Sequence, residues 1–528
     1  MLKPLCKGDF ISILRNCKKE RNLPYTKLIY EQIRNADLDT DIDIGNHLIP
    51  ALVECGSLSD AQNVFNKLMQ PNTCAWTYLI LGYVENGYSE HAFNLFSKMQ
   101  TTVHPNMFTL LTMLKACSQL LCLMSGRVIH SEVVNYQYET DLFICNSLLD
   151  MYAKCGSLTD AREVFDRLLE KDVVSWTALI AGYVDHGFDE IALICLDQMQ
   201  AENVSPNAVT YFYCIKACIN MEAIDKGRKL HMKMVRDGFG KDPLPAGMLM
   251  ELYAKWGSIQ RAHNVFDELP VKNTVLWTTL ITAYTDQGFY EEAMACLKEM
   301  EAAHSSPDAI TYVCALKVCG NLGVLEKGLE LHSKTVKSGF DYDLILCSIL
   351  MDMYVKCGQM AEIEKIFGRL PLRDVVAWTA LLSGYAYQGQ YDMVLYHFER
   401  MIEEGTEPNA TTFLIIFTVC NHAGFAIGGL HHFRAMVEEF DIFPSIKHYN
   451  SMVDLLGRAG QLNGAADILD KMPFQPNIIT WETVLGSCRI WGDVCLAKQA
   501  YECAEKLDGY HGGILVLMSN IYANNISE

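Results

Sequence analysis

The sequence repeats itself with a period of about 100 residues, and this repetition constrains the fold more than any other feature. The segments around Trp76, Trp176, Trp277 and Trp378 are near copies of one another, for example VVSWTALIAGYVDHG at Val173–Gly187. Self-similarity at a fixed period is typical of repeat arrays, in which each supersecondary unit packs on its neighbours. The chain is therefore expected to form one long array, although its length alone would also allow several globular domains.

Each period holds three units of about 35, 31 and 35 residues. The second and third units form two further families of near copies. The second family comprises Gly45–Phe65, Ile144–Phe165 (ICNSLLDMYAKCGSLTDAREVF), Gly247–Phe266 and Ser348–Phe367, and the third comprises Leu114–Leu120 (LKACSQL), Ile215–Met221 and Leu316–Leu322.

Each unit is predicted to be two short amphipathic helices joined by a tight turn. Apolar residues recur at helical spacing, as at Trp176, Leu179, Ile180 and Tyr183. A second helix follows with a small-to-large step such as Ala161 to Phe165. Glycines that should close the first helices in the left-handed conformation are Gly56, Gly87, Gly156, Gly187, Gly257, Gly288, Gly358 and Gly389. One hairpin cannot bury its own apolar face, so we expect an all-α fold, a right-handed α-solenoid of helix-turn-helix repeats.

The charge balance limits the partners of the chain. It carries 63 acidic and 43 basic residues, for a formal net charge of -20. This argues against tight non-specific binding to duplex nucleic acid or to anionic membranes, both of which require basic surface. It leaves open RNA binding in a groove whose local potential differs from the average.

Cysteine usage and hydropathy indicate a reduced protein with no membrane span. The 20 cysteines include no C-x-x-C pair, and we expect them inside helices as small packing residues, as at Cys55, Cys155 and Cys357. No apolar run reaches the ~18 residues of a transmembrane helix. The first ten residues are like neither a signal peptide nor a transit peptide, so no targeting segment is expected in this chain.

The motifs SLLDMYAKCGSLTDAREVFD, VVSWTALIAGY and LKAC resemble the plant pentatricopeptide repeat family, in the subclass with alternating P, long (L) and short (S) units. The resemblance runs from about Lys7 to the C-terminus and leaves residues 1–6 as an N-terminal stub. It implies fourteen repeats over residues 7–477: L 7–41, S 42–72, P 73–106, L 107–141, S 142–172, P 173–207, L 208–242, S 243–273, P 274–308, L 309–343, S 344–374, P 375–409, a variant L 410–445 and a variant S 446–477.

Residues 478–528 resemble the extension motifs of that subclass. Ile478–Leu507 is similar to the first motif, and Gly512–Ala523 to the start of a second, truncated one. The cytidine-deaminase-like DYW domain that often follows is missing from this sequence. By resemblance, such proteins recognise sites of C-to-U RNA editing in a mitochondrion or chloroplast.

The resemblance also implies that the fifth and last residues of each P and S unit recognise one RNA base. Thr and Asn are mediocre helix formers, so their recurrence at the fifth position needs an explanation beyond the helix itself. Local bonding to the preceding turn is the alternative for the fifth residue, and N-capping of the next helix for the last. The predicted base-reading pairs are Asn46 with Asn72, Thr77 with Asn106, Asn146 with Asp172, Thr177 with Asn207, Thr278 with Asp308, Ser348 with Asp374, Thr379 with Asn409, and Asn450 with Asn477.

The pairing rule of the family converts these residues into a target. With L units and the unit of Gly247 left unread, it gives 5′-N-C-A-N-U-A-N-N-G-N-G-A-N-C-3′. Two departures bear on this target. Gly247 stands where Asn or Ser is usual, and the P unit 73–106 is one residue short before Asn106, which could shift its register.

Catalysis is expected from a partner. Zinc deaminases need H-x-E followed by P-C-x-x-C. The H-x-E at His130 to Glu132 has no such sequel, and the His431–His432 pair is interpreted as a helix-surface feature. No cofactor is expected. The resemblance implies a monomer on single-stranded organellar RNA, together with multiple organellar RNA editing factors and a DYW-type deaminase. The alternatives are a factor for RNA stability, splicing or translation, and a tetratricopeptide-like protein-binding scaffold, which the acidic charge would suit.

Overall fold

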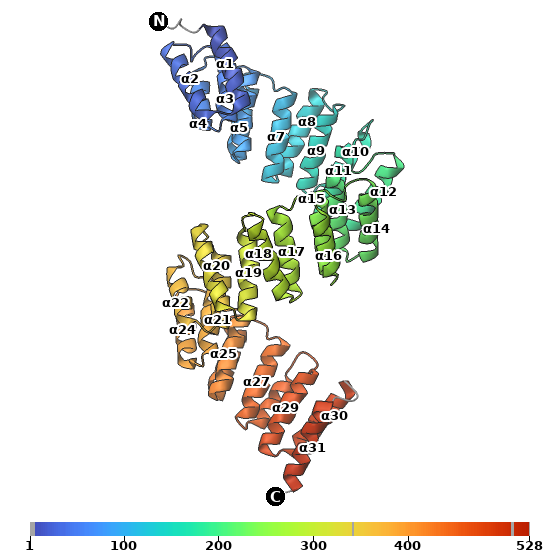
Figure 1. Ribbon diagram of the computed structural model, residues 1–528, viewed down its shortest axis with the longest axis vertical. Helices are drawn as coiled ribbons and strands as arrows, with labels where there is room; N and C mark the ends of the chain where they lie inside the picture. Colours follow the sequence, from blue (N-terminus) through green and yellow to red (C-terminus); the bar gives the residue numbers. More distant parts are fainter. Residues whose placement is uncertain (1–5, 341–342, 508–511, 527–528) are drawn as a thin grey trace. The chain divides into compact units, whose positions relative to one another are not determined.

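The computed structural model describes residues 6–340, 343–507 and 512–526, and these are helical throughout apart from short turns (Figure 1). No β-strand occurs in the described residues, so the predicted all-α class is confirmed. The expected stub, residues 1–6, lies outside the described residues except for Cys6. Within the described ranges, no helix is both long and apolar enough to cross a membrane.

The chain divides into two bodies, which are described separately: an N-terminal body, Met1–Lys272, and a C-terminal body, Asn273–Glu528. The helices of the N-terminal body are α1 (Lys7–Glu20), α2 (Leu23–Asn35), α3 (Ile42–Glu54), α4 (Leu58–Lys67), α5 (Thr73–Glu85), α6 (Ser89–Gln100), α7 (Met107–Leu120), α8 (Leu123–Asn135), α9 (Leu142–Lys154), α10 (Leu158–Arg167), α11 (Val173–Asp185), α12 (Asp189–Ala201), α13 (Ala208–Asn220), α14 (Ile224–Arg236), α15 (Pro243–Lys255) and α16 (Ile259–Glu268).

The C-terminal body is built in the same way. Its helices are α17 (Thr274–Asp286), α18 (Tyr290–Ala302), α19 (Ala309–Leu322), α20 (Leu325–Lys337), α21 (Leu344–Lys356), α22 (Met360–Arg369), α23 (Val375–Tyr387), α24 (Tyr391–Glu403), α25 (Ala410–Ala423), α26 (Ala426–Glu438), α27 (Ile446–Arg458), α28 (Leu462–Asp470), α29 (Ile478–Trp491), α30 (Val494–Leu507) and α31 (Gly512–Ile526).

Within each body the odd-numbered helices form one continuous row. Each packs on the next odd-numbered helix, for example α9 on α7 and on α11. Each even-numbered helix packs on its own hairpin partner and on the first helix of the next hairpin, as α12 does on α11 and α13. Figure 1 shows these hairpins following one another in series in each body. The predicted solenoid is therefore confirmed.

A recurring aromatic contact explains the period of about 100 residues. The ring of Trp176, 1% exposed, meets Phe165 edge-on with centroids 4.6 Å apart. The contact joins the second helix of one hairpin to the first helix of the next. It recurs between Phe65 and Trp76 at 4.6 Å and between Phe367 and Trp378 at 4.7 Å. Such edge-to-face pairs contribute roughly 0.5–1.5 kcal/mol beyond the area that they bury.

Two kinds of glycine shape the hairpins. The glycines predicted to close the first helices all have positive φ, such as 79° at Gly156, so this prediction is confirmed. Gly182 has a different role, because a Cβ there would lie 2.7 Å from the Cβ of Ala153. Its missing side chain lets α11 approach α9 closely, which positions the first helices that carry the candidate site.

The cysteines are mostly packing residues, with one correction to the prediction. All twenty are free thiols, and most are buried. Cys55, Cys155 and Cys357, which were expected inside helices, instead come directly after α3, α9 and α21 and are only half-buried. These helices end one residue earlier than expected because the following glycine already turns the chain.

Candidate nucleic-acid interface

The fifth residues lie along the row of odd-numbered helices, partly buried against the next hairpin. Thr77, Thr177, Thr278 and Ser348 are each 7% or 8% exposed. The hydroxyl of Thr77 donates to the carbonyl of Thr73 at 2.7 Å, four residues earlier. Equivalent bonds to the preceding turn occur at Thr278, Thr379 and Ser348. The local bonding that was the alternative for this position is therefore present at these four residues.

The last residue of each P and S unit is the N-cap of the next odd-numbered helix. The Oδ1 atom of Asn106, for instance, accepts a hydrogen bond from the backbone N–H of Thr109 at 2.9 Å. This cap is the same as that of Asn207, so the missing residue in unit 73–106 does not displace Asn106. The remaining predicted last residues cap in the same way, namely Asn72, Asp172, Asp308, Asp374, Asn409 and Asn477.

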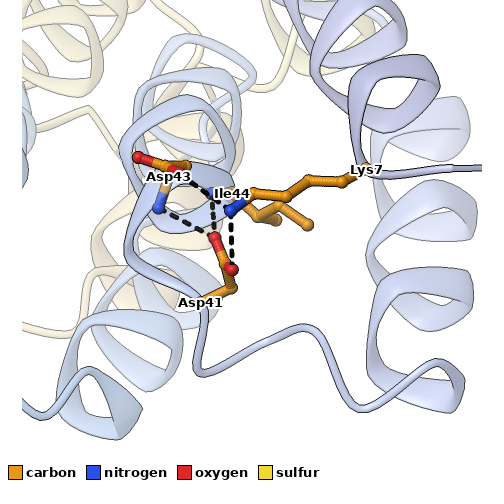
Figure 2. Close-up of polar contacts among 4 residues, drawn as sticks. All are labelled: Lys7, Asp41, Asp43 and Ile44. Carbon is orange, nitrogen blue, oxygen red and sulfur yellow. Dashed lines mark hydrogen bonds and ion pairs between the residues drawn. The ribbon is translucent and has the colours of Figure 1, made fainter.

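The last residue of an L unit also caps the next first helix, although the fifth residue of that unit is apolar. Figure 2 shows Asp41, whose Oδ1 accepts the N–H groups of Asp43 and Ile44 at 2.9 and 3.1 Å. Its other oxygen, Oδ2, forms an ion pair with Lys7 at 2.8 Å. Both oxygens of Asp41 are thus already occupied, and the fifth residue of this unit is Ile11. Capping alone accounts for this aspartate.

The fifth and last residues of the predicted pairs lie next to each other across the hairpin boundary. The Asn146 amide donates to Asp172 Oδ1 at 3.4 Å, and the Thr278 hydroxyl lies 3.4 Å from Asp308 Oδ1. Gly247 occupies the fifth position of α15 and offers no side chain for a comparable contact.

Two neighbouring pairs open into one groove in the N-terminal body. The groove has a volume of about 810 Å³ and is lined by Asn146, Asp172, Thr177 and Asn207. These are the predicted reading residues of two consecutive units, S 142–172 and P 173–207. The structure therefore places four hydrogen-bonding side chains along one continuous depression: two from α9 and α11, and two from the N-caps of α11 and α13.

Exposed apolar side chains at the second position of the first helices flank these polar residues, and they were not predicted from the sequence. Phe143 is 73% exposed and Val174 51%, and both line the groove. The signal was available, because an apolar residue stands two places after each cap in most units. The exposed members of this second-position row are Phe108, Phe143, Val174, Val209, Leu244, Val275, Ile310, Ile345, Val376 and Ile479.

The groove is less acidic than the chain as a whole. Lys115 and Lys154 line it together with Asp150 and Asp172. Burial raises the pKa of Asp172, but hydrogen bonds from the backbone N–H and hydroxyl of Ser175 outweigh this effect, so its pKa lies below the usual range. Asp172 is therefore ionised at neutral pH and acts only as a hydrogen-bond acceptor.

The histidine of the H-x-E motif is engaged in packing. His130 Nδ1 lies 2.7 Å from the hydroxyl of Tyr152, and burial lowers the pKa of its imidazole. No group of three or more His, Cys, Asp or Glu side chains in the described ranges is arranged to hold a metal ion.

Comparisons with known proteins identify repeat proteins that are similar to the chain. A model of the PPR repeat family matches residues 71–119, 171–220, 272–321 and 373–422, and a model of the single PPR repeat matches 143–173, 345–375 and 447–474. A chloroplastic pentatricopeptide repeat-containing protein of Arabidopsis thaliana is 32% identical over 516 residues, which is 98% of this chain and 59% of the relative. A mitochondrial one from the same plant is 32% identical over 520 residues, 98% of this chain and 75% of the relative.

Solved structures agree on the fold. The structural match to the pentatricopeptide repeat protein PPR10 from maize covers 98% of this chain and 95% of the PPR10 chain. Its TM-score is 0.55, and the two sequences are 18% identical. PPR10 has also been solved in complex with an 18-nt psaJ RNA element, and that structure matches with a TM-score of 0.56. The family models and the Arabidopsis relatives together show that this chain belongs to the pentatricopeptide repeat family.

Proposed function

We propose that the chain binds single-stranded RNA along the row of odd-numbered helices and reads one base at each P or S unit with a hydrogen-bonding fifth residue. The observation that carries the proposal is the groove in which Asn146, Asp172, Thr177 and Asn207 lie together beside exposed Phe143 and Val174. Unpaired bases are recognised by hydrogen bonds to their edges and by contacts to their faces. The polar pairs suit the edges, and the second-position row suits the faces.

N-capping determines which side-chain atom of the last residue remains free to contact a base. A backbone N–H is a donor, so it must meet an oxygen, which in Asn207 is the amide Oδ1. The atom that remains for a base is then the Nδ2 donor of an asparagine or the Oδ2 acceptor of an aspartate. Asn and Asp at this position thus offer opposite hydrogen-bonding groups from the same anchored geometry.

The family and its neighbours support RNA as the ligand. PPR10 binds an RNA element, and this chain shares its fold. With the P, L and S assignments of the sequence analysis, the proposed target is 5′-N-C-A-N-U-A-N-N-G-N-G-A-N-C-3′. The L units are proposed to act as spacers or as surfaces for protein partners, because their fifth residues are apolar.

The proposal predicts a base swap. Replacing Thr177→Asn creates an Asn/Asn pair with Asn207, so preference at the corresponding base should move from A towards C by about fivefold, the size of one hydrogen-bond difference. Gel-shift titration with RNAs that differ only at this base measures it. The matched control is Thr101→Asn, at an exposed helix end away from the groove. Unchanged preference in the Thr177 variant would refute the code assignment.

We further propose that the bound RNA is an organellar transcript and that the chain marks a site of C-to-U editing in a mitochondrion or chloroplast. Two of the relatives above are named chloroplastic and mitochondrial. A DYW-type deaminase and multiple organellar RNA editing factors would act as partners. Sequencing organellar transcripts from a loss-of-function plant tests this role. An unedited cytidine just downstream of a matching site supports it, whereas unaltered editing leaves RNA stability, splicing or translation as the function.

One observation favours a second function of a different class. The net charge of -20 suits a protein-binding scaffold better than an RNA-binding surface. A scaffold would not need the repeated Thr and Asn at the fifth position. Failure of the wild-type chain to bind the proposed RNA would favour the scaffold.

A further inference from the structure

A third side chain joins the fifth and last residues in most of the predicted pairs. It is the hydroxyl at the third position of the following unit, within the first turn of the next odd-numbered helix. Thr210 is an example: its hydroxyl donates to Asn207 Oδ1 at 3.0 Å and lies 2.7 Å from the hydroxyl of Thr177. Thr210 is fully buried, so this contact forms away from water.

The same arrangement recurs in both bodies. Thr311 bridges Thr278 and Asp308 with two distances of 2.7 Å. Ser175 lies 2.7 Å from Asn146 Oδ1 and 2.8 Å from Asp172 Oδ1. The bridging hydroxyls of the six pairs that have one are those of Thr109, Ser175, Thr210, Thr311, Thr412 and Thr480.

A hydroxyl has one hydrogen and two lone pairs, and this fixes what the pair can offer to a base. When Thr210 donates its hydrogen to Asn207, it can only accept from Thr177. Thr177 then has only lone pairs left, which suit a base edge that donates. Ser175 faces two acceptor oxygens with one hydrogen, so it satisfies Asn146 or Asp172 but not both fully. The bridging hydroxyl therefore couples the hydrogen-bonding states of the two reading residues.

Two of the eight pairs lack the bridge and act as natural comparisons. Ala75 and Ala377 occupy the third position after the pairs of Asn46 and Ser348. In the first case the Oδ1 atom of Asn46 is buried and has no hydrogen-bond partner in the structure. An unsatisfied buried acceptor is costly. The missing hydroxyl at Ala75 thus coincides with a reading residue whose amide oxygen has no hydrogen-bond partner.

We propose that the third-position hydroxyl of the following unit is a specificity-determining positioning residue, so that a base is read by three side chains across the unit boundary. This inference rests on the proposed RNA-reading function. The hydroxyl acts through the fifth and last residues and sets which of their atoms remain for the base.

Reciprocal substitutions test the proposal. Ser175→Ala should lower the discrimination at the base read by Asn146 and Asp172 by about fivefold, as expected for one hydrogen bond, with the other bases unaffected. Ala75→Ser should raise discrimination at the base read by Asn46 and Asn72 by about threefold, because it supplies the missing donor. Ser97→Ala is the control, since that exposed hydroxyl bonds only within α6. Fluorescence anisotropy with four RNAs per position gives the discrimination, and circular dichroism verifies folding.

The outcomes separate the inference from the function on which it rests. Loss at one base in Ser175→Ala and gain at another in Ala75→Ser support the three-residue reading unit. Wild-type discrimination in a folded Ser175→Ala variant, or no gain in Ala75→Ser, would overturn the inference alone. If the wild-type chain binds none of the RNAs, the proposed function itself fails.

Discussion

At the scale of single residues, the last position of each unit combines a structural and a proposed reading role. Asn207 and Asp242 both cap a first helix, but only Asn207 is the last residue of a unit whose fifth residue is polar. Replacing either with alanine should lower the free energy of unfolding by about 1 kcal/mol, as cap removal usually does. Only Asn207→Ala should also lose base preference.

Urea titrations and RNA titrations of the two alanine variants measure these effects side by side. Because both changes remove a cap, Asp242→Ala controls for the loss of stability. Equal loss of base preference in both variants would mean that the last residue acts only through helix stability.

The candidate site could be predicted only in part from sequence. Thr77 and Asn106 stand out as unusual residues in a repeated column, so the fifth and last positions emerge from periodicity, and their base-reading role stays a prediction. The exposed row of Val174 and its equivalents was missed because an apolar residue in an amphipathic helix is ordinarily read as core. The contact between Thr177 and Thr210 was missed because it depends on how neighbouring hairpins stack.

At the scale of elements, three helix pairs are joined by the same histidine–tyrosine hydrogen bond. His130, His231 and His332 lie on the second helices of L units. Each ring nitrogen is 2.7 or 2.8 Å from the hydroxyl of Tyr152, Tyr253 or Tyr354, respectively. Burial lowers the pKa of all three imidazoles. These helix pairs are therefore stable with neutral histidines. Protonation would bury a charge and lower the free energy of unfolding.

This pairing predicts acid sensitivity. A histidine whose folded pKa is depressed contributes stability that is complete above its ordinary pKa of about 6.5 and is lost as the pH falls towards its folded pKa. The urea midpoint should therefore drop between pH 7 and pH 5. A triple variant with glutamine at positions 130, 231 and 332 should show a smaller drop, because glutamine does not titrate. An identical pH profile for wild type and variant would contradict this assignment.

At the scale of the whole molecule, the period of the sequence was enough to predict the architecture. Copies of the Trp176 segment spaced by 100 or 101 residues require equivalent environments, and a stack of hairpins provides them. The ends of the helices were predictable to within about one residue, because glycines such as Gly156 and caps such as Asp172 mark them. The division into two bodies at Lys272 was not predictable, since the repeat pattern runs through it without interruption.

The acidic chain should bind RNA with a weak dependence on salt. Five lysines of the first helices lie close to carboxylates, so a phosphate that displaces one of these carboxylates releases few counterions. The pairs are Lys115–Glu85 at 3.9 Å, Lys154–Asp150 at 2.8 Å, Lys216–Asp185 at 2.7 Å, Lys255–Glu251 at 3.3 Å and Lys356–Asp352 at 2.9 Å. For single strands, the slope of the logarithm of the binding constant against the logarithm of the salt concentration is about −0.7 per phosphate neutralised. We expect the chain to neutralise about two phosphates, which gives a slope near −1.4.

Affinity for the proposed RNA should therefore fall by less than about tenfold between 50 and 200 mM salt. Removing one carboxylate tests the cause directly. Asp150→Asn frees Lys154, which lines the groove, and should steepen the slope by about 0.7 while raising affinity at low salt. Anisotropy titrations at four salt concentrations measure both slopes. A wild-type slope steeper than about −4 would mean that RNA contacts unpaired basic residues instead, because such a slope requires about six neutralised phosphates.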